Sequence, residues 1–305
     1  IHDTFVTRSG QARLMNSTVI SQVILPIALF TIMLGMGMSL VVNDFRQVAS
    51  RPRTIFLGIG LQMVWLPLIG FVVVTLFQLP AELALGLLIL TFAPGGATSN
   101  MIAFLCRADT ALSITLTAIA SLITPFTLPL LAAAVFQLWT GDSEAIPFPI
   151  LETMLKLVVI TILPVSIGMM LNHYFPSFCE KSRKPVKVLS ILFLLLIIVG
   201  IAKANWDQLP AYIAVVGPAV MAMVIIAIGS SYWIARRVGL FTPQALSIGI
   251  EVGIQNAGTA LLVTGTVLQN PAMSASALIY GILMQIPALI LIAYRTTGNR
   301  ASAAV

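Results

Sequence analysis

Glu251 is a single acidic residue in the middle of a long apolar stretch, within the segment Glu251-Val-Gly-Ile-Gln-Asn256. A carboxylate at mid-membrane depth is costly and usually marks an ion or proton path. An earlier apolar stretch has a second polar interruption, Pro94-Gly-Gly-Ala-Thr-Ser-Asn100. Two such breaks in corresponding halves of a chain predict the midplane binding site of a secondary transporter.

The first interruption is not expected to continue as a regular helix. Pro94 removes a backbone donor, and the glycine pair Gly95-Gly96 leaves the backbone unlocked. In hydrocarbon, unwound backbone is tolerated only where it faces protein, water or an ion. A simple kink is the alternative, but Ser99 and Asn100 directly after the break favour a site.

The stretch that follows carries hydroxyl side chains on one helical face. Spacings of three and four residues align five of them: Thr110, Ser113, Thr117, Ser121 and Thr124. Such stripes often only allow close helix packing. Ser113 and Thr117 fall at the depth of Ser99 and are expected to meet the break. Gln62, in an earlier apolar stretch, is a polar amide of the kind that usually bonds between helices.

These segments offer carboxylate, amide and hydroxyl oxygens but no sulfur or imidazole. Oxygen-only sets suit hard cations. Glu251 alone fits three roles, namely a protonated structural acid, a proton carrier or an ionised cation ligand. Its oxygen-rich surroundings favour the third role.

The composition requires lipid around the chain. Of 305 residues, 59% are hydrophobic and only 9% are charged, and the mean hydropathy is +1.03. A soluble domain would carry roughly a quarter charged residues. The net charge of +6 is scattered between apolar runs, which is typical of cytoplasmic loops and not of a nucleic-acid interface. We therefore expect an all-α polytopic membrane protein with no nucleic-acid partner.

A spanning helix needs about 20 apolar residues. On that basis the chain has nine predicted spans, at residues 18–42, 54–78, 82–105, 109–138, 148–172, 186–204, 210–235, 243–269 and 272–294. In the fifth span, Glu152 and Lys156 are four residues apart, so they can either pair with each other or extend outward to the membrane surface.

The basic residues predict the orientation. With the N-terminus outside, twelve of the sixteen Lys and Arg residues fall on the inner side: Arg46, Arg51, Arg53, Arg107, Lys181, Arg183, Lys184, Lys187, Arg236, Arg237, Arg295 and Arg300. This bias predicts a cytoplasmic C-terminus in the cell (inner) membrane.

Spans three and eight are five helices apart, so they cross the membrane in opposite directions. Each has an apolar run, then glycine with small polar residues, then an amide, which favours an inverted repeat. We expect a single membrane domain over residues 1–305, with a first repeat at 18–138, a connector helix and cytoplasmic loop at 139–185, and a second, inverted repeat at 186–294.

Three motifs together resemble the bile acid:sodium symporter family, in order and spacing, over nearly the whole chain: Ala93-Pro-Gly-Gly-Ala-Thr-Ser-Asn100, Ala111-Leu-Ser113 followed by Thr117, and Glu251-Val-Gly-Ile-Gln-Asn256. The resemblance implies a six-helix core, a panel of the remaining helices, and two broken core helices that cross near the midplane. Many bacterial members have ten spans, so a removed first span and a nine-span form are both open.

The resemblance also implies two sodium ions that share Glu251. Sodium site 1 would use Ser99, Asn100, Ser113, Thr117 and Glu251. Sodium site 2 would use Gln62, Glu251, Gln255 and the backbone carbonyls near Val252 and Ile254. The residues expected to face substrate are Thr98 and Asn256.

The predicted function is sodium-coupled symport of an organic anion, bile-acid-like or a small carboxylate, by alternating access. A proton-coupled anion carrier or exchanger on the same scaffold is the alternative. An enzyme is not favoured, because the spans contain no nucleophile–base pair; a receptor without transport is a further alternative. Since no arginine falls inside a predicted span, we expect helix ends and amides to hold the anion.

Overall fold

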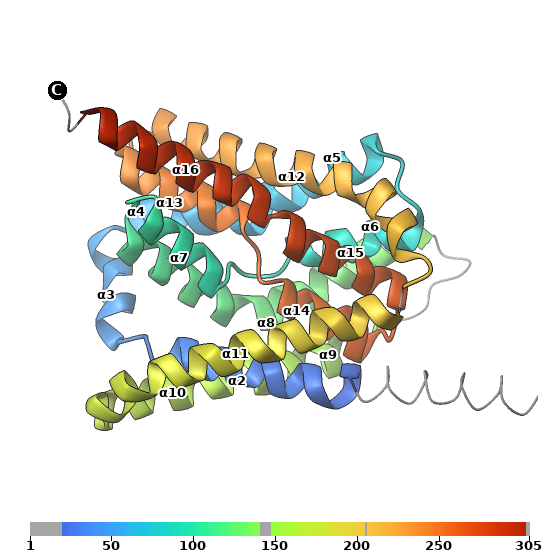
Figure 1. The fold of residues 1–305 in the computed structure, drawn as a ribbon, viewed down its shortest axis with the longest axis horizontal. Coiled ribbons are helices and arrows are strands. Elements are labelled where there is room, and N and C mark those ends of the chain that lie inside the picture. Colours follow the sequence, from blue (N-terminus) through green and yellow to red (C-terminus); the bar gives the residue numbers. More distant parts are fainter. Residues whose placement is uncertain (1–19, 141–147, 205, 303–305) are drawn as a thin grey trace, which may run out of the picture.

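The helices run along the long axis of the molecule, and their ends gather at two opposite sides (Figure 1). The computed structural model describes residues 20–140, 148–204 and 206–302. One end carries the short helix α3 (Val42–Ser50); we call it the α3 end. The α-helices that follow α3 in the chain are α4 (Pro52–Gly60), α5 (Leu66–Leu76), α6 (Ala81–Thr91), α7 (Ala97–Leu105), α8 (Thr110–Thr140), α9 (Ile150–Leu157), α10 (Leu163–Tyr174), α11 (Pro176–Ala204), α12 (Leu209–Arg237), α13 (Thr242–Gly253), α14 (Ala257–Leu261), α15 (Pro271–Leu283) and α16 (Gln285–Ser302); α2 (Leu25–Gly37) precedes it.

Three apolar helices contain a π-helical turn directly before a proline. The turns Ile20–Ile24, Leu61–Trp65 and Val158–Ile162 each lead into a helix whose first residues include proline. Proline lacks a backbone N–H and its ring crowds the preceding turn, so one wider turn keeps the helix continuous. The turn Leu61–Trp65 also contains Gln62, which is 1% exposed.

Within the described residues, five helical stretches are long and apolar enough to cross a membrane: Pro52–Leu76, Thr110–Trp139, Ile150–Tyr174, Leu209–Arg237 and Pro271–Thr296. Shorter apolar helices occupy Gln22–Gly37, Ala81–Thr91 and Ala257–Val267. These helices confirm the prediction of a helical, multi-pass membrane protein. In the fifth span, Glu152 and Lys156 pair with each other, with Lys156 Nζ 2.6 Å from Glu152 Oε1.

Helix α11 is longer than the span expected at 186–204. It begins at Pro176, so residues 176–185, which were expected to lie in a cytoplasmic loop, are helical. Apolarity alone cannot detect this extension, because it includes Glu180, Lys181, Arg183 and Lys184, residue types that form helices well but do not enter lipid.

The two interrupted helices lie at the centre of the molecule. In α6 every residue from Leu83 to Thr91 is buried, and in α13 every residue from Ala245 to Gly253. Helices that are buried on all sides occupy the interior of a bundle. The breaks that follow them are therefore enclosed by other helices.

Along one side of the molecule, α2, α10 and α11 pack on one another (Figure 1); we call these three helices the α2 layer. The crossing of α2 and α10 is very close. A Cβ atom on Gly37 would lie 2.3 Å from the carbonyl oxygen of Val165, and one on Gly168 would lie 2.5 Å from that of Leu34. Small residues permit such approaches between membrane helices.

Gly168→Ala is expected to destabilise the protein by about 1–3 kcal/mol, because the added methyl group meets backbone atoms that cannot move aside. Gly229→Ala, in α12, is the control: nothing lies within 4 Å of its added Cβ. That change should be neutral or stabilising by up to about 1 kcal/mol. Thermal unfolding in one detergent checks both, and equal melting temperatures would contradict the close crossing.

Candidate functional site

Two unwound segments cross and pair at the centre of the molecule. One joins α6 to α7 and the other joins α13 to α14. Gly95 and Gln255 form an antiparallel β-bridge, and the Asn256 N–H donates to the Pro94 carbonyl at 2.9 Å. The backbone groups released by one break are thus partly satisfied by the other. Each predicted break is present, and the two cross.

Glu251 lies against this crossing and is 2% exposed. A Cβ atom on Gly95 would lie 1.9 Å from Glu251 Oε1. Any side chain at position 95 would therefore displace the carboxylate. The neighbouring glycine is less restricted, since a Cβ on Gly96 would lie 3.6 Å from the Asn256 Cβ, an ordinary contact.

Three hydroxyl groups surround the carboxylate. Ser99 Oγ lies 2.8 Å and Ser113 Oγ 3.2 Å from Glu251 Oε2, and Thr117 Oγ1 lies 2.5 Å from Oε1. The Asn100 side-chain oxygen joins the same group, 2.8 Å from Ser113 Oγ and 3.2 Å from Thr117 Oγ1. Helices α7, α8 and α13 each contribute to this cluster, which we call the Glu251 cluster.

The Glu251 cluster has too few protons for its oxygens. Each hydroxyl carries one proton, but Ser99 has two acceptors within hydrogen-bond distance, Ser113 has two and Thr117 has three. Oxygen pairs without a proton between them repel, and burial strengthens that repulsion. A positive ion among these oxygens, or a proton on Glu251, would reduce it.

The atoms available as ligands in the Glu251 cluster indicate which kind of ion could bind there. No group of three His, Cys, Asp or Glu residues suited to a metal occurs in the part of the chain that the structure describes. One carboxylate with neutral amide and hydroxyl oxygens suits a hard cation of low charge better than a transition metal.

A second cluster lies on the other side of Glu251. Gln62 Nε2 donates to Gln255 Oε1 at 2.8 Å and to the Ala93 carbonyl at 3.0 Å. Gln255 Nε2 in turn donates to the Val252 carbonyl at 2.7 Å and to the Glu251 carbonyl at 3.2 Å. We call this the Gln62 cluster. Ile254 lies between Val252 and Gln255 in the chain and has an extended backbone. Its carbonyl therefore points away from the helical hydrogen-bond ladder of α13.

The structure thus brings together the side chains predicted for sodium site 1, and it joins Gln62 to Gln255 of sodium site 2. Their role as ligands stays a prediction. Ser121 and Thr124, further along the same face of α8, are buried without a hydrogen-bond partner. Thr98 is partly buried on α7, and the Asn256 side chain accepts from the Thr259 N–H at 3.3 Å. Neither residue is among those that line the cavity described next, and their predicted contact with substrate is untested.

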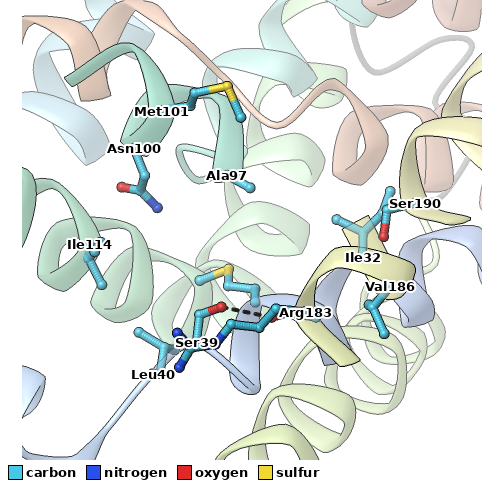
Figure 2. A pocket seen from close by; sticks show the side chains of 12 residues that line it. Ile32, Ser39, Leu40, Ala97, Asn100, Met101, Ile114, Arg183, Val186 and Ser190 are labelled. Atoms are coloured by element: carbon cyan, nitrogen blue, oxygen red, sulfur yellow. Dashed lines mark hydrogen bonds between the residues drawn. The ribbon is translucent and has the colours of Figure 1, made fainter. Parts of the chain in front are cut away.

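A cavity of about 360 Å³ separates the α2 layer from α7 and α8 (Figure 2). Its size is within the range of small-molecule sites. The lining residues are Ile32, Gly35, Met36, Ser39, Leu40, Ala97, Asn100, Met101, Ile114, Arg183, Val186 and Ser190. Asn100 therefore belongs to both the cavity and the Glu251 cluster.

Sequence reasoning missed Arg183. It was assigned to a cytoplasmic loop, but the longer α11 places it on the cavity wall. A usable signal was present, since Arg183, Val186 and Ser190 are spaced three and four residues apart, which is one face of a helix.

Comparisons with known proteins agree on one family. The model of the Sodium Bile acid symporter family matches residues 26–211. An uncharacterized sodium-dependent transporter, YocS, of Bacillus subtilis is 28% identical over 231 residues, covering 74% of this chain and 69% of that protein. The ileal sodium/bile acid cotransporter of Oryctolagus cuniculus is 30% identical over 246 residues, covering 78% and 68%.

A plant relative is similar over a smaller share of its length. The probable chloroplastic sodium/metabolite cotransporter BASS1 of Arabidopsis thaliana is 29% identical over 245 residues, which is 78% of this chain but 58% of that protein. The chain therefore spans less than two thirds of the length of this plant relative.

Gly95→Ala is expected to destabilise the protein by about 1–3 kcal/mol, because its methyl group overlaps the Glu251 carboxylate. Gly96→Ala is the matched control at the next position and should change stability little. The measurement is the melting temperature of each variant in the same detergent and salt. If both alanines shift it equally, the contact between position 95 and the carboxylate is not what requires glycine.

Proposed function

The chain belongs to the sodium bile acid symporter family, and from that premise we propose that it imports an organic anion together with two sodium ions. Its family consists of transporters and not enzymes. The observation that carries the proposal is the shortage of protons among the buried oxygens around Glu251.

One sodium ion would bind in the Glu251 cluster. Its ligands would be the oxygens of Ser99, Asn100, Ser113, Thr117 and Glu251. The second would bind between Glu251 and the Gln62 cluster. Its ligands would be the side-chain oxygens of Gln62, Gln255 and Glu251 with the carbonyls of Val252 and Ile254. A carboxylate shared by two cations leaves about one net positive charge, which an anionic substrate would offset.

Asn100 links the ions to the cavity. Its side-chain oxygen faces Ser113 and Thr117, while no described residue accepts a hydrogen bond from its amide nitrogen. Sodium at the oxygen would fix the amide plane and present its N–H groups to a ligand in the cavity. Coupling then equals the differential affinity of sodium for that arrangement, typically about 1–3 kcal/mol.

Alternating access is supported by the unequal packing at the two ends. At the end away from α3, Gln22 Nε2 donates to the Thr266 carbonyl at 3.2 Å, which joins the π-helical turn before α2 to the turn after α14. Towards the α3 end the cavity separates α2 and α11 from α7 and α8. In this state the site would face the α3 end, and movement of the α2 layer against the other helices would expose it to the opposite side.

The basic residues near the α3 end support a cytoplasmic position for that end, in the cell (inner) membrane. We further propose nine spans, with α2, α10 and α11 in the panel. The inverted repeats at 18–138 and 186–294 are supported by the two central breaks. Each break lies at the same distance from the start of its helix: Leu79, just before α6, precedes Pro94 by as many residues as Leu240, just before α13, precedes Gln255. The two helices α6 and α13 start from opposite ends of the molecule, as inverted repeats require (Figure 1).

Sodium should raise the thermal stability of the wild type more than potassium or choline does. At a concentration 100 times its Kd, one bound ion would add about 2.7 kcal/mol. Glu251→Gln should abolish the sodium-specific part, because it removes the shared charge. Glu152→Gln, which removes an exposed carboxylate far along the chain, should retain it. Equal stabilisation of the wild type by all three cations would contradict the proposal.

Uptake into proteoliposomes tests the number of ions. With radiolabelled taurocholate and a set of small carboxylates as probes, the sodium dependence of wild-type uptake should have a Hill coefficient approaching 2, the number of sites. Gln62→Ala should lower it towards about 1. Gln285→Ala should not, since within the described residues this glutamine at the start of α16 donates only to the Gly281 carbonyl of the adjoining α15. Uptake that follows a pH gradient and ignores sodium would instead establish the proton-coupled alternative.

A further inference from the structure

The cavity carries one charge on an otherwise neutral wall. Most of its lining is apolar, from Ile32, Met36 and Leu40 on α2 or just after it to Met101 on α7 and Ile114 on α8. Of the lining residues, Arg183 alone is charged. It belongs to the α2 layer, whereas Asn100 lies on the opposite wall. Figure 2 shows the Arg183 side chain extending from α11 towards Ser39 and Leu40.

The helix geometry aims Arg183 at the cavity. Arg183, Val186 and Ser190 line it from one face of α11. Arg183 and the neighbouring cation Lys184 are both exposed residues, but Lys184 does not line the cavity. Gly35 brings α2 against this face, since a Cβ there would lie 2.7 Å from Val186 Cγ1. The guanidinium is therefore carried next to a close contact between two helices.

Arg183 has no partner among the residues that the structure describes. The ion pairs in that part of the chain are Arg51 with Asp109 and Glu152 with Lys156. No hydrogen bond uses the Arg183 guanidinium either. Its five N–H donors form a planar fork that matches a carboxylate, sulfonate or phosphate. A fork without an acceptor beside an apolar cavity is suited to an amphipathic anion.

We propose that Arg183 binds the acid group of the transported anion, so that the α2 layer and not the crossing of the broken helices recognises the charge. The proposal rests on the function proposed above. It defines the substrate as an organic acid with an apolar body that fits beside Met36, Met101 and Ile114. A neutral hydrogen-bond acceptor on the substrate would then meet the Asn100 amide.

This arrangement gives each wall a separate task. On one wall, Asn100 would respond to sodium binding, and on the other wall Arg183 would bind the negative charge of the substrate. A substrate that touches both would hold the α2 layer and the Glu251 cluster together. An uncharged analogue would fill the same space without the contact to Arg183.

The test is equilibrium binding to the purified protein in sodium-containing detergent without added lipid. The probes are 2-naphthylacetate and cholate, each compared with its uncharged primary amide. Arg183→Ala should weaken binding of the acids by about tenfold or more, as expected for loss of a charge-assisted hydrogen bond, and leave binding of the amides unchanged. Lys184→Ala, which removes a charge from the adjacent position, should alter neither.

Equal losses for acids and amides in Arg183→Ala, or no loss for the acids, would overturn the proposal. So would acids and amides that bind the wild type equally well. Sodium-specific thermal stabilisation is measured in parallel. If it persists in Arg183→Ala, such a result overturns only the role of Arg183 and leaves the proposed function intact. Its absence from the wild type would instead contradict the proposed function.

An anionic lipid headgroup offers Arg183 the same chemistry as a substrate acid. Nanodiscs with and without phosphatidylglycerol separate the two sources. If phosphatidylglycerol stabilises the wild type but not Arg183→Ala, and the affinity for the acids is the same in both proteins, then Arg183 binds a lipid phosphate and the proposal is wrong. Acid binding that depends on Arg183 in both kinds of nanodisc supports it.

Discussion

The Glu251 carboxylate imposes the strongest physical demand in this molecule. A buried carboxyl group needs partners, and this one lies where helices cross and where a single methyl group at position 95 would collide with it. The partners come from three helices, so α7, α8 and α13 must keep their mutual register for the cluster to exist. The two unwound segments, in turn, are stable only because each satisfies backbone groups of the other.

That central crossing also explains why the outer helices are free to differ in how they pack. The α2 layer meets the rest of the molecule across a cavity at one end and through the Gln22–Thr266 hydrogen bond at the other. Within the layer, α2 and α10 contact each other through glycine against backbone, which leaves little room for adjustment. A rigid layer beside a rigid centre, with a gap at one end, is the arrangement from which a rocking movement can arise.

Under the two proposals, the α2 layer recognises the charge of the anion and the Glu251 cluster recognises sodium. Asn100 faces the Glu251 cluster and the cavity together, whereas Arg183 reaches the cavity from α11. Sodium affinity would then change when Asn100 and its hydroxyl partners reorient, and anion affinity when the distance between the two walls changes. Linkage between the two ligands requires no direct contact between them.

The sequence by itself determined the helical, lipid-embedded class, both helix breaks and the oxygen-rich residues around them. These follow from local chemistry: apolar length, proline and glycine that interrupt a helix, and a stripe of hydroxyls at helical spacing. Tertiary structure alone decided that the breaks pair, that Gln62 reaches Gln255 and that α11 extends back to Pro176. The physical reason is that these contacts join residues far apart in the chain, and a charged helix extension has no apolar signature. Arg183 therefore looked like a loop cation in the sequence and became a cavity residue only when α2 and α11 packed against each other.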